Sequence, residues 1–264
     1  MGNSPRDIRD EAVAQWGNDP AGSVAAGPEP LGTERSFARV EDYRYHEQPW
    51  MHETFQYESY SGARVLEIGV GLGTDHLQFA RAGAHMTGVD LTPRCVDLTR
   101  RRFEQEGQTS DLRVMDAESL EFEDSSFDAV YSFGVLHHVP SSERAFKEVR
   151  RVLRPGGQFV GALYSRRSYY YARIRVERML WRQYRWESLE DRLARIEYST
   201  SDSRPLVRLF TKAELRSALQ EAGFQEVLIR RRHVGFGRLT RYVPAPVERA
   251  LGRLAGWYLV HRAT

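Results

Sequence analysis

The chain has 264 residues, of which 41% are hydrophobic and 28% are charged, and its formal net charge is only +2. This length and hydrophobic fraction suffice for one large core. The near balance of charge argues against a general nucleic-acid binder and against a disordered chain. Cys95 is the only cysteine, which excludes an internal disulfide and a paired-cysteine metal site.

The N-terminal region contains no apolar stretch of the secretory kind, and no window approaches the ~18 apolar residues of a membrane span. We therefore expect a cytoplasmic protein without integral membrane association. Residues 18–34 are rich in Gly, Pro and Ala, which is typical of a loop. This loop separates a short predicted helix, about 6–16, from an aromatic stretch, 35–59, expected to be helical in parts and broken near Pro49.

Apolar runs and helical segments alternate from residue 63 onward. Strands are predicted at 63–68, 85–90, 111–115, 127–133, 157–164, 225–232 and 256–263. Helices are predicted at 75–84, 92–107, 141–153, 211–224 and 246–254. Such alternation implies βαβ crossovers, and so a doubly wound α/β fold whose parallel sheet is covered on both faces. Only a short segment separates the last two strands, so one of them is expected to run antiparallel.

Residues 165–205 interrupt the alternation with a basic, aromatic insertion. In a helix its apolar residues share one face: Ala172, Val176, Met179 and Leu180. Its arginines lie mostly elsewhere: Arg175, Arg178, Arg182 and Arg185. Three interpretations stay open: a solvated basic face over a packed apolar stripe, a substrate cap in which Tyr170 contacts the acceptor, and a helix lying on a membrane surface.

The most informative motif is Glu67-Ile-Gly69-Val-Gly71-Leu-Gly73, which follows the first strand and opens a helix. Glycines let such a turn approach a ligand closely, and the free N–H groups at the helix start suit an anionic group. Asp90 ends the second strand, nineteen residues after Gly71, where a carboxylate accepts ribose hydroxyls. This pair indicates an adenosine-containing cofactor. Dinucleotide sites favour G-x-G-x-x-G, whereas this turn reads G-x-G-x-G.

Five segments together resemble successive motifs of one known family. They are LEIGVGLGTD, GVDLTP, DAESLEF, FDAVYSFGVLHHV and EVRRVLRPGG, in this order. They resemble class I S-adenosylmethionine (SAM)-dependent methyltransferases, most closely the small-molecule branch that includes ubiquinone and menaquinone biosynthesis enzymes. The resemblance implies a Rossmann-like, mostly parallel seven-stranded sheet with its last strand antiparallel. The implied organisation is a helical lid over 1–62 and a methyltransferase domain over 63–264, with 165–205 as an inserted helical cap.

The same resemblance implies a role for each motif residue. Three glycines would line the methionine and ribose portion of SAM: Gly69, Gly71 and Gly73. Asp90 would hold the ribose, Leu91 would pack on adenine, and Asp116 with the Ala117 backbone would bind the adenine amino group. The residues expected beside the sulfonium are Ser132, Phe133 and Gly134. Glu67 would orient the glycine turn, with local backbone amides as its alternative partners.

The acceptor is expected to be a small molecule, methylated on O, N or C, and the sequence leaves its identity open. His137 and His138 follow the fourth strand, where an imidazole of pKa near ~6.5 could deprotonate a phenol or enol. Alternatively, these histidines cap the next helix and orient the loop. Tyr43, Tyr45 and Trp50 either wall the acceptor pocket or pack an added helix on the core. No metal site is expected, since no second His/Asp/Glu set has ligand spacing.

Two other functions are weighed against methyl transfer: a SAM-binding partner that lost catalysis, and a nucleotide-dependent oxidoreductase. The glycine spacing and the absence of a Tyr-x-x-x-Lys pair disfavour the oxidoreductase. No nucleic-acid partner is expected, and peripheral membrane contact and oligomeric state stay open.

Overall fold

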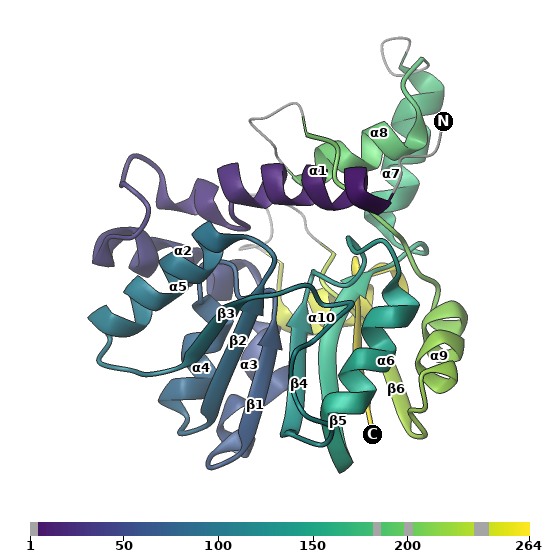
Figure 1. Ribbon diagram of the computed structural model, residues 1–264. Coiled ribbons are helices and arrows are strands. Elements are labelled where there is room, and N and C mark those ends of the chain that lie inside the picture. Colours follow the sequence, from purple (N-terminus) through teal and green to yellow (C-terminus); the bar gives the residue numbers. More distant parts are fainter. Residues whose placement is uncertain (1–4, 182–185, 198–202, 235–242) are drawn as a thin grey trace.

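A computed structural model describes residues 5–181, 186–197, 203–234 and 243–264 (Figure 1). Its strands form one seven-stranded sheet of order β3-β2-β1-β4-β5-β7-β6. The strands are β1 (Arg64–Ile68), β2 (His85–Asp90), β3 (Asp111–Val114), β4 (Phe127–Phe133), β5 (Leu153–Tyr164), β6 (Val227–Arg232) and β7 (Tyr258–Ala263). Only β7 pairs antiparallel, with β5 on one side and β6 on the other. The predicted α/β class and the antiparallel last strand are therefore confirmed.

The helices lie close to the predicted ranges. They are α1 (Pro5–Asn18), α2 (Glu34–Glu47), α3 (Trp50–Phe55), α4 (Thr74–Arg81), α5 (Pro93–Gln105), α6 (Ser142–Val152), α7 (Tyr169–Leu180), α8 (Leu189–Ala194), α9 (Lys212–Glu221) and α10 (Ala245–Ala255). Pro49 stands between α2 and α3, where the break was expected. Proline is compatible with a helix start because its missing N–H would have no intrahelical partner there.

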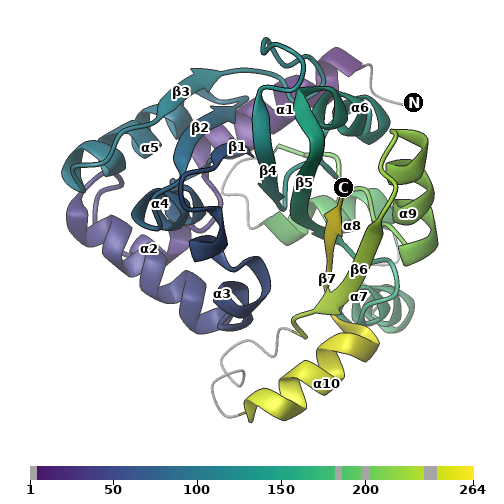
Figure 2. The same cartoon turned by 90° about the horizontal axis from the view of Figure 1, so that it is seen from below.

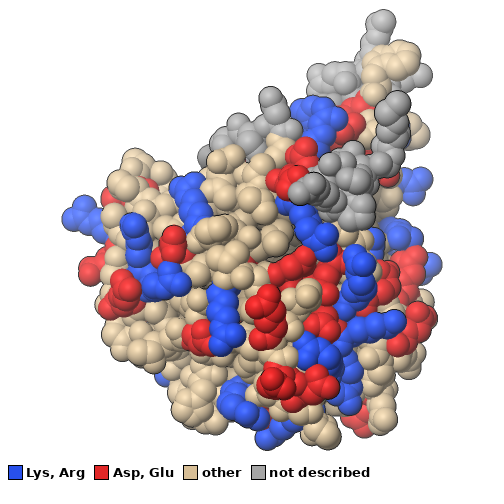
Figure 3. All heavy atoms as spheres, viewed as in Figure 1, with Lys and Arg blue, Asp and Glu red and all other residues tan. Residues whose placement is uncertain are grey.

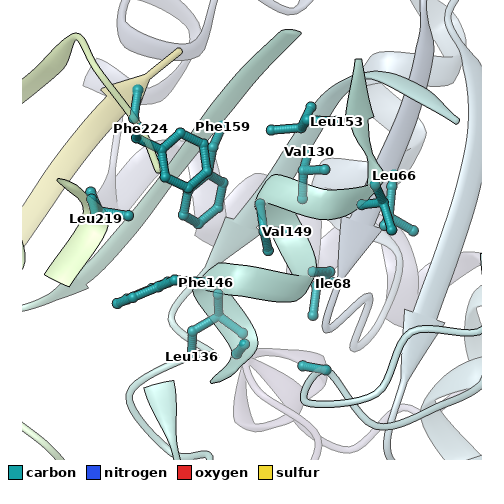
Figure 4. Close-up of a cluster of buried hydrophobic side chains, with 14 of the residues drawn as sticks. Leu66, Ile68, Val130, Leu136, Phe146, Val149, Leu153, Phe159, Leu219 and Phe224 are labelled. Carbon is teal, nitrogen blue, oxygen red and sulfur yellow. The ribbon is translucent and has the colours of Figure 1, made fainter. Parts of the chain in front are cut away.

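The two faces of the sheet are buried separately because side chains alternate along each strand. On one face, Leu66 and Ile68 of β1 join Phe146 and Val149 of α6 and Leu219 of α9 in a large apolar cluster (Figure 4). On the other face, neighbouring strand residues pack under α3, α4 and α5 with a group of aromatic side chains. Figure 2 shows α4 and α5 on one side of the sheet and α6 and α9 on the other.

The strand ends that position the site lie at one edge of the sheet. The five parallel strands β1 to β5 share a direction, so the residues that follow them meet at their carboxyl ends. In open α/β sheets ligands bind at this edge. Helix α1 crosses above it in Figure 1, and α7 and α8 stand beside α1.

Two local features differ from the sequence-based expectation. Strand β5 begins at Leu153, before the Arg154-Pro155-Gly156-Gly157 turn, and its pairing with β4 shifts register between Phe127 and Ala129. The predicted apolar stripe of α7 points outward: Val176, Met179 and Leu180 are 48–69% exposed, whereas Ile174 is buried. The packed-stripe interpretation is thus wrong, because Ile174 occupies the inward face, against Tyr164, Leu193 and Trp257. Arg182 and Arg185 lie outside the described residues.

Charge is mixed on the surface. On the face seen in Figure 3, acidic and basic side chains alternate without a broad area of one sign. Among the described residues, none of the helices has the length and hydropathy needed to cross a membrane.

Candidate cofactor and acceptor site

A cavity of about 800 Å³ opens at the carboxyl ends of the parallel strands. One part, here called the cofactor end, is walled by the residues that follow β1, β2 and β3, including Gly69, Asp90 and Asp116. The other part, here called the acceptor end, is walled mainly by aromatic and titratable side chains from several elements. These are Trp16, Phe133, His138, Tyr164, Tyr170, Glu197, Trp257 and Tyr258.

The three glycines of the turn after β1 have different surroundings. All three have positive φ, at +83°, +55° and +69° for Gly69, Gly71 and Gly73, which disfavours a side chain. A Cβ at Gly69 would stand 2.2 Å from a methyl carbon of Val135, and one at Gly73 would stand 2.9 Å from Thr99. A Cβ at Gly71 would meet nothing within 4 Å. Gly69 and Gly73 thus serve close packing, whereas Gly71 leaves open space on the cavity wall.

Gly73 is not among the described residues that line the cavity, although Gly69 and Gly71 are. It is the N-cap residue of α4. The family-based expectation for Gly73 therefore rests on its effect on the turn rather than on a position at the wall.

Asp90 fixes the glycine turn from the end of β2. One carboxylate oxygen accepts a hydrogen bond from the Gly71 backbone N–H at 3.0 Å. The other accepts from the N–H and hydroxyl of Thr92, at 2.9 and 2.8 Å. Burial raises the pKa of Asp90, and these hydrogen bonds offset part of that effect. The sequence-predicted pair of glycine turn and acidic residue is therefore brought together at the cavity wall.

Glu67 is bound by a side chain that the sequence gave no reason to choose. Its carboxyl group lies 2.9 Å from Nδ1 of His76 in α4, and Nε2 of His76 lies 2.8 Å from the Ser110 hydroxyl. Burial raises the pKa of Glu67 well above its ordinary value and lowers that of His76 to about 3. Both groups therefore favour their neutral forms, as expected for a hydrogen-bonded pair away from water.

Asp75, in the first turn of α4, ties the N-terminal helices to the glycine turn. Its carboxylate accepts two hydrogen bonds from Arg44 of α2, at 3.2 and 2.5 Å. The hydroxyls of Tyr45 and Tyr131 donate to it at 3.0 and 2.7 Å. The Arg44 guanidinium also lies 4.2 Å above the Phe133 ring. Sequence reasoning assigned no role to Arg44 or Asp75, because their partners lie 30 to 89 positions away along the chain and no local spacing pairs them.

Asp116 lies at the cofactor end, where the adenine was expected. One of its oxygens accepts from Arg9 Nε of α1 at 2.6 Å, and the other accepts from the Glu118 backbone N–H at 2.9 Å. Arg9 also donates to the Glu118 side chain at 2.6 Å. An adenine amino group would have to share this carboxylate with Arg9. Helix α1 is thereby held against the cofactor end.

The remaining predicted cofactor residues fall into two groups. Those that line the cavity are Leu91, Ala117, Phe133 and Gly134. Ser132 is buried, and its hydroxyl donates to the Ile68 carbonyl at 3.1 Å, so it braces two adjacent strands instead. A Cβ at Gly134 would meet nothing within 4 Å, which leaves room on the wall as at Gly71.

The two histidines after β4 differ in position. His138 lines the cavity, and its Nδ1 lies 2.6 Å from the Leu206 carbonyl. His137 is fully buried, is not among the described lining residues, and stacks on Tyr164 with 3.9 Å between ring centroids. Burial lowers the pKa of both, to about 4 for His138. Helix α6 is capped by Ser141 rather than by either histidine.

Glu197 was not a sequence candidate, yet its carboxyl group lies beside these histidines. It ends a short 3-10 helix (Arg195–Glu197), and its Oε1 lies 3.6 Å from Nε2 of His138. Among the described residues, neither of these two buried atoms has a hydrogen-bond partner. Burial raises the pKa of Glu197 to about 7, and a hydrogen bond from Tyr164 opposes part of this shift. Fifty-nine positions separate Glu197 from His138, so no local spacing could have paired them.

His137, His138 and Glu197 bring three ligand-type atoms within 4.8 Å of one another. This set was not visible in the sequence, which predicted no metal site. Two imidazoles that bind one zinc ion tetrahedrally have ring centroids roughly 5 Å apart, given Zn–N bonds of about 2.1 Å. The two rings here stack at 4.0 Å. Their arrangement therefore suits proton sharing better than a tetrahedral metal centre.

Of the aromatic residues expected at the acceptor pocket, some line the cavity and others are packed away from it. Tyr43 and Tyr170 line the cavity. Trp50 is buried among Phe55, Phe133 and Tyr258, with ring centroids 6.1–6.3 Å away. Tyr45 is engaged with Asp75, and neither Tyr45 nor Trp50 is among the described lining residues. These two therefore occupy the packing position that the sequence left open as an alternative.

Comparison with known proteins agrees with this geometry. A family model described as a methyltransferase domain matches residues 66–161. A sterol 24-C-methyltransferase of Gibberella zeae is 30% identical over 167 residues, covering 62% of this chain and 40% of that protein. A ubiquinone biosynthesis O-methyltransferase of Xanthomonas axonopodis pv. citri is 38% identical over 99 residues, covering 37% and 41%.

A solved structure extends the likeness of fold to the whole chain. The Burkholderia thailandensis 1,6-didemethyltoxoflavin-N1-methyltransferase, bound to 1,6-didemethyltoxoflavin and S-adenosylhomocysteine, matches with a TM-score of 0.56 and 20% identity. The match covers 100% of this chain and 91% of that one. By contrast, this chain spans only about a quarter to a half of the length of the curated relatives it matches.

Proposed function

We propose that the chain is a class I SAM-dependent methyltransferase, which transfers the methyl group of SAM to an O, N or C atom of a small-molecule acceptor; the match of residues 66–161 to a methyltransferase domain and the likeness to sterol and ubiquinone methyltransferases support this. The observation that carries the proposal is the Asp90–Gly71 bond at the wall of a cavity that continues into an aromatic chamber. One end has the groups for an adenosyl cofactor, and the other has room for a second molecule.

The residues present fit SAM. The open positions at Gly71 and Gly134 leave the wall free of Cβ atoms where a ligand would lie. Asp90 would hold the ribose, Leu91 would contact the adenine, and Asp116 would bind its amino group. SAM supplies a methyl group that is already activated on a sulfonium. The chain's own work is then to orient the acceptor atom and to exclude water from the contact.

The N-terminal segment is proposed as a lid, as the sequence suggested for residues 1–62. Arg9, Ala12 and Trp16 of α1 are part of the cavity wall, and Arg9 is bound to Asp116. Tyr170 and Arg173 of α7 support the corresponding proposal that residues 165–205 cap the acceptor.

Calorimetric titration with SAM, S-adenosylhomocysteine and NADH tests the cofactor assignment. We expect both adenosyl ligands to bind and NADH to give no heat. Binding of NADH alone would contradict the proposal. Transfer of label from methyl-labelled SAM to any member of a panel of phenols, amines and enols then separates an enzyme from a SAM-binding partner without catalysis.

A further inference from the structure

Glu197 and His138 face each other at the acceptor end, and their position limits which acceptors the site suits. Both side chains line the cavity, with Oε1 and Nε2 3.6 Å apart. They come from different elements, the 3-10 helix after α8 and the loop after β4. A buried carboxylate oxygen and a buried ring nitrogen without partners are costly to keep in a fold, which points to an external partner.

The hydrogen-bond roles of the pair follow from its neighbours. The Leu206 carbonyl can only accept, so Nδ1 of His138 carries the hydrogen and donates to it. In the neutral ring, Nε2 then presents a lone pair toward Glu197. A lone pair in this place stabilises a proton on Glu197 Oε1, because only the protonated carboxyl group can donate to it.

Among the residues that the structure describes, the other groups named here around Glu197 contact it without supplying a cation. Tyr164 of β5 and Tyr258 of β7 are both close enough to interact with its carboxyl group electrostatically. Gln15 of α1 donates to the Glu197 backbone carbonyl at 3.4 Å. The groups that face Glu197 from these elements are thus neutral at physiological pH, and Arg173 of α7 is a cation elsewhere on the same cavity wall.

We propose that Glu197, supported by His138, is the proton acceptor for a planar aromatic acceptor that bears a weakly acidic hydroxyl. This inference rests on the proposed methyl transfer and names its acceptor class. The hydroxyl O–H bond breaks, and its proton forms a new O–H bond at Glu197 Oε1. The electron pair left on the acceptor oxygen would form the oxygen–methyl bond as the methyl–sulfur bond of bound SAM breaks, with S-adenosylhomocysteine as the leaving group. Tyr164, Tyr170 and Trp257 pack against one another and line the cavity, so they give the acceptor end an aromatic wall that suits a planar molecule.

The burial of Glu197 matches this role. Its pKa of about 7 makes it a carboxylate for much of the time at neutral pH, yet basic enough to take a proton from a phenol or enol. An exposed glutamate is a far weaker base. A carboxylate that stays ionised cannot form a hydrogen bond with an imidazole lone pair, because both groups are acceptors.

The test uses 2-naphthol as a probe, because its excited state is strongly acidic and its naphtholate form emits at longer wavelength. The protein is first saturated with S-adenosylhomocysteine, and that binding is measured by calorimetry. Bound 2-naphthol is then excited outside the protein's absorption. We expect a naphtholate-to-naphthol emission ratio at least threefold higher in the native protein than in E197Q. This ratio should fall as the pH drops below about 7, where Glu197 becomes protonated.

Three controls make the outcome decisive. E190Q, at an exposed carboxylate of α8, should leave the emission ratio unchanged. E197Q should bind S-adenosylhomocysteine within twofold of the native protein, which shows that the variant is folded. Dialysis against EDTA should also leave the emission ratio unchanged. A fall in the ratio after dialysis would show that a metal ion, rather than Glu197 alone, takes up the proton, and would overturn the inference.

Equal emission ratios in the native protein and E197Q overturn the inference, and so does the absence of 2-naphthol binding. If S-adenosylhomocysteine still binds normally, either of these results leaves the proposed methyl transfer unaffected. Failure of S-adenosylhomocysteine to bind overturns the proposed function, and the inference falls with it.

Discussion

The cofactor end and the acceptor end of the cavity are built in different ways. At the cofactor end, each predicted group follows a parallel strand, and short local connections position it, as in the turn from Gly69 to Gly73. At the acceptor end, the wall is assembled from α1, the loop after β4, the ends of β5 and β7, and the segment around Glu197. The first end is therefore set by local chain geometry, and the second by how distant elements pack.

The largest expected effect separates packing from binding within the glycine turn. G69A should destabilise the fold by about 2–5 kcal/mol, because it combines a left-handed backbone with a clash against Val135. G71A, with no neighbour within 4 Å, should cost only about 1–2 kcal/mol yet weaken SAM at least about tenfold. Urea unfolding and calorimetry measure the two quantities. Equal destabilisation by both variants would contradict this division of roles.

The acceptor end should carry a pH signature of its own. The folded-state pKa of Glu197, about 7, lies above its ordinary value of 4.5, so the fold favours the protonated form. Its contribution to stability is complete below about pH 4.5 and is lost as the pH rises through 7. The difference in unfolding free energy between the native protein and E197Q should change by ~3 kcal/mol across that window.

Urea unfolding of both proteins at pH 5, 6, 7 and 8 checks this. The buried histidines lose stability in the opposite direction, as the pH falls below 6.5, and this loss occurs in both proteins. A difference that stays flat with pH would show that Glu197 titrates as an exposed carboxylate does.

D90A tests the cofactor end directly. Loss of the carboxylate should weaken SAM by roughly 2–3 kcal/mol, because it removes charge-assisted hydrogen bonds to the ribose. D90A should also loosen the turn, since Gly71 N–H loses its partner. D90N keeps an acceptor oxygen but loses the charge, so its affinity for SAM should lie between those of the native protein and D90A. If the folded D90A protein bound SAM with native affinity, the assignment of the ribose site would be lost.

The smallest expected effect concerns the contact between the lid and the cofactor end. R9A removes a partly exposed arginine that bridges Asp116 and Glu118, so it should cost about 1 kcal/mol in SAM affinity. R35A, at an exposed position of α2, is the matched control and should leave affinity unchanged. If R9A and the native protein bound SAM with equal affinity, the contact of α1 with Asp116 would have no part in cofactor binding.

The contrast between the two ends also explains which sequence predictions succeeded. Strand ends and the glycine turn leave a local signature, so Gly71 and Asp90 were both identified, although the hydrogen bond between them was seen only in the structure. The insertion shows the opposite case. Periodicity correctly indicated a helix and placed Val176 and Met179 on one apolar face, but the interpretation in which that face is packed is wrong, because Ile174 packs inward instead. A helical pattern with apolar residues on several sides does not specify which side meets the core.

Sequence by itself determined the alternation of strands and helices, the order of the motifs and the cofactor turn, because each depends on residues near one another in the chain. Tertiary structure alone decided that Arg44 binds Asp75, that Arg9 binds Asp116, and that Glu197 faces His138. The physical reason is that burial and distance, rather than spacing along the chain, set the partners and the proton affinity of a charged side chain. Those quantities exist only once the elements have packed.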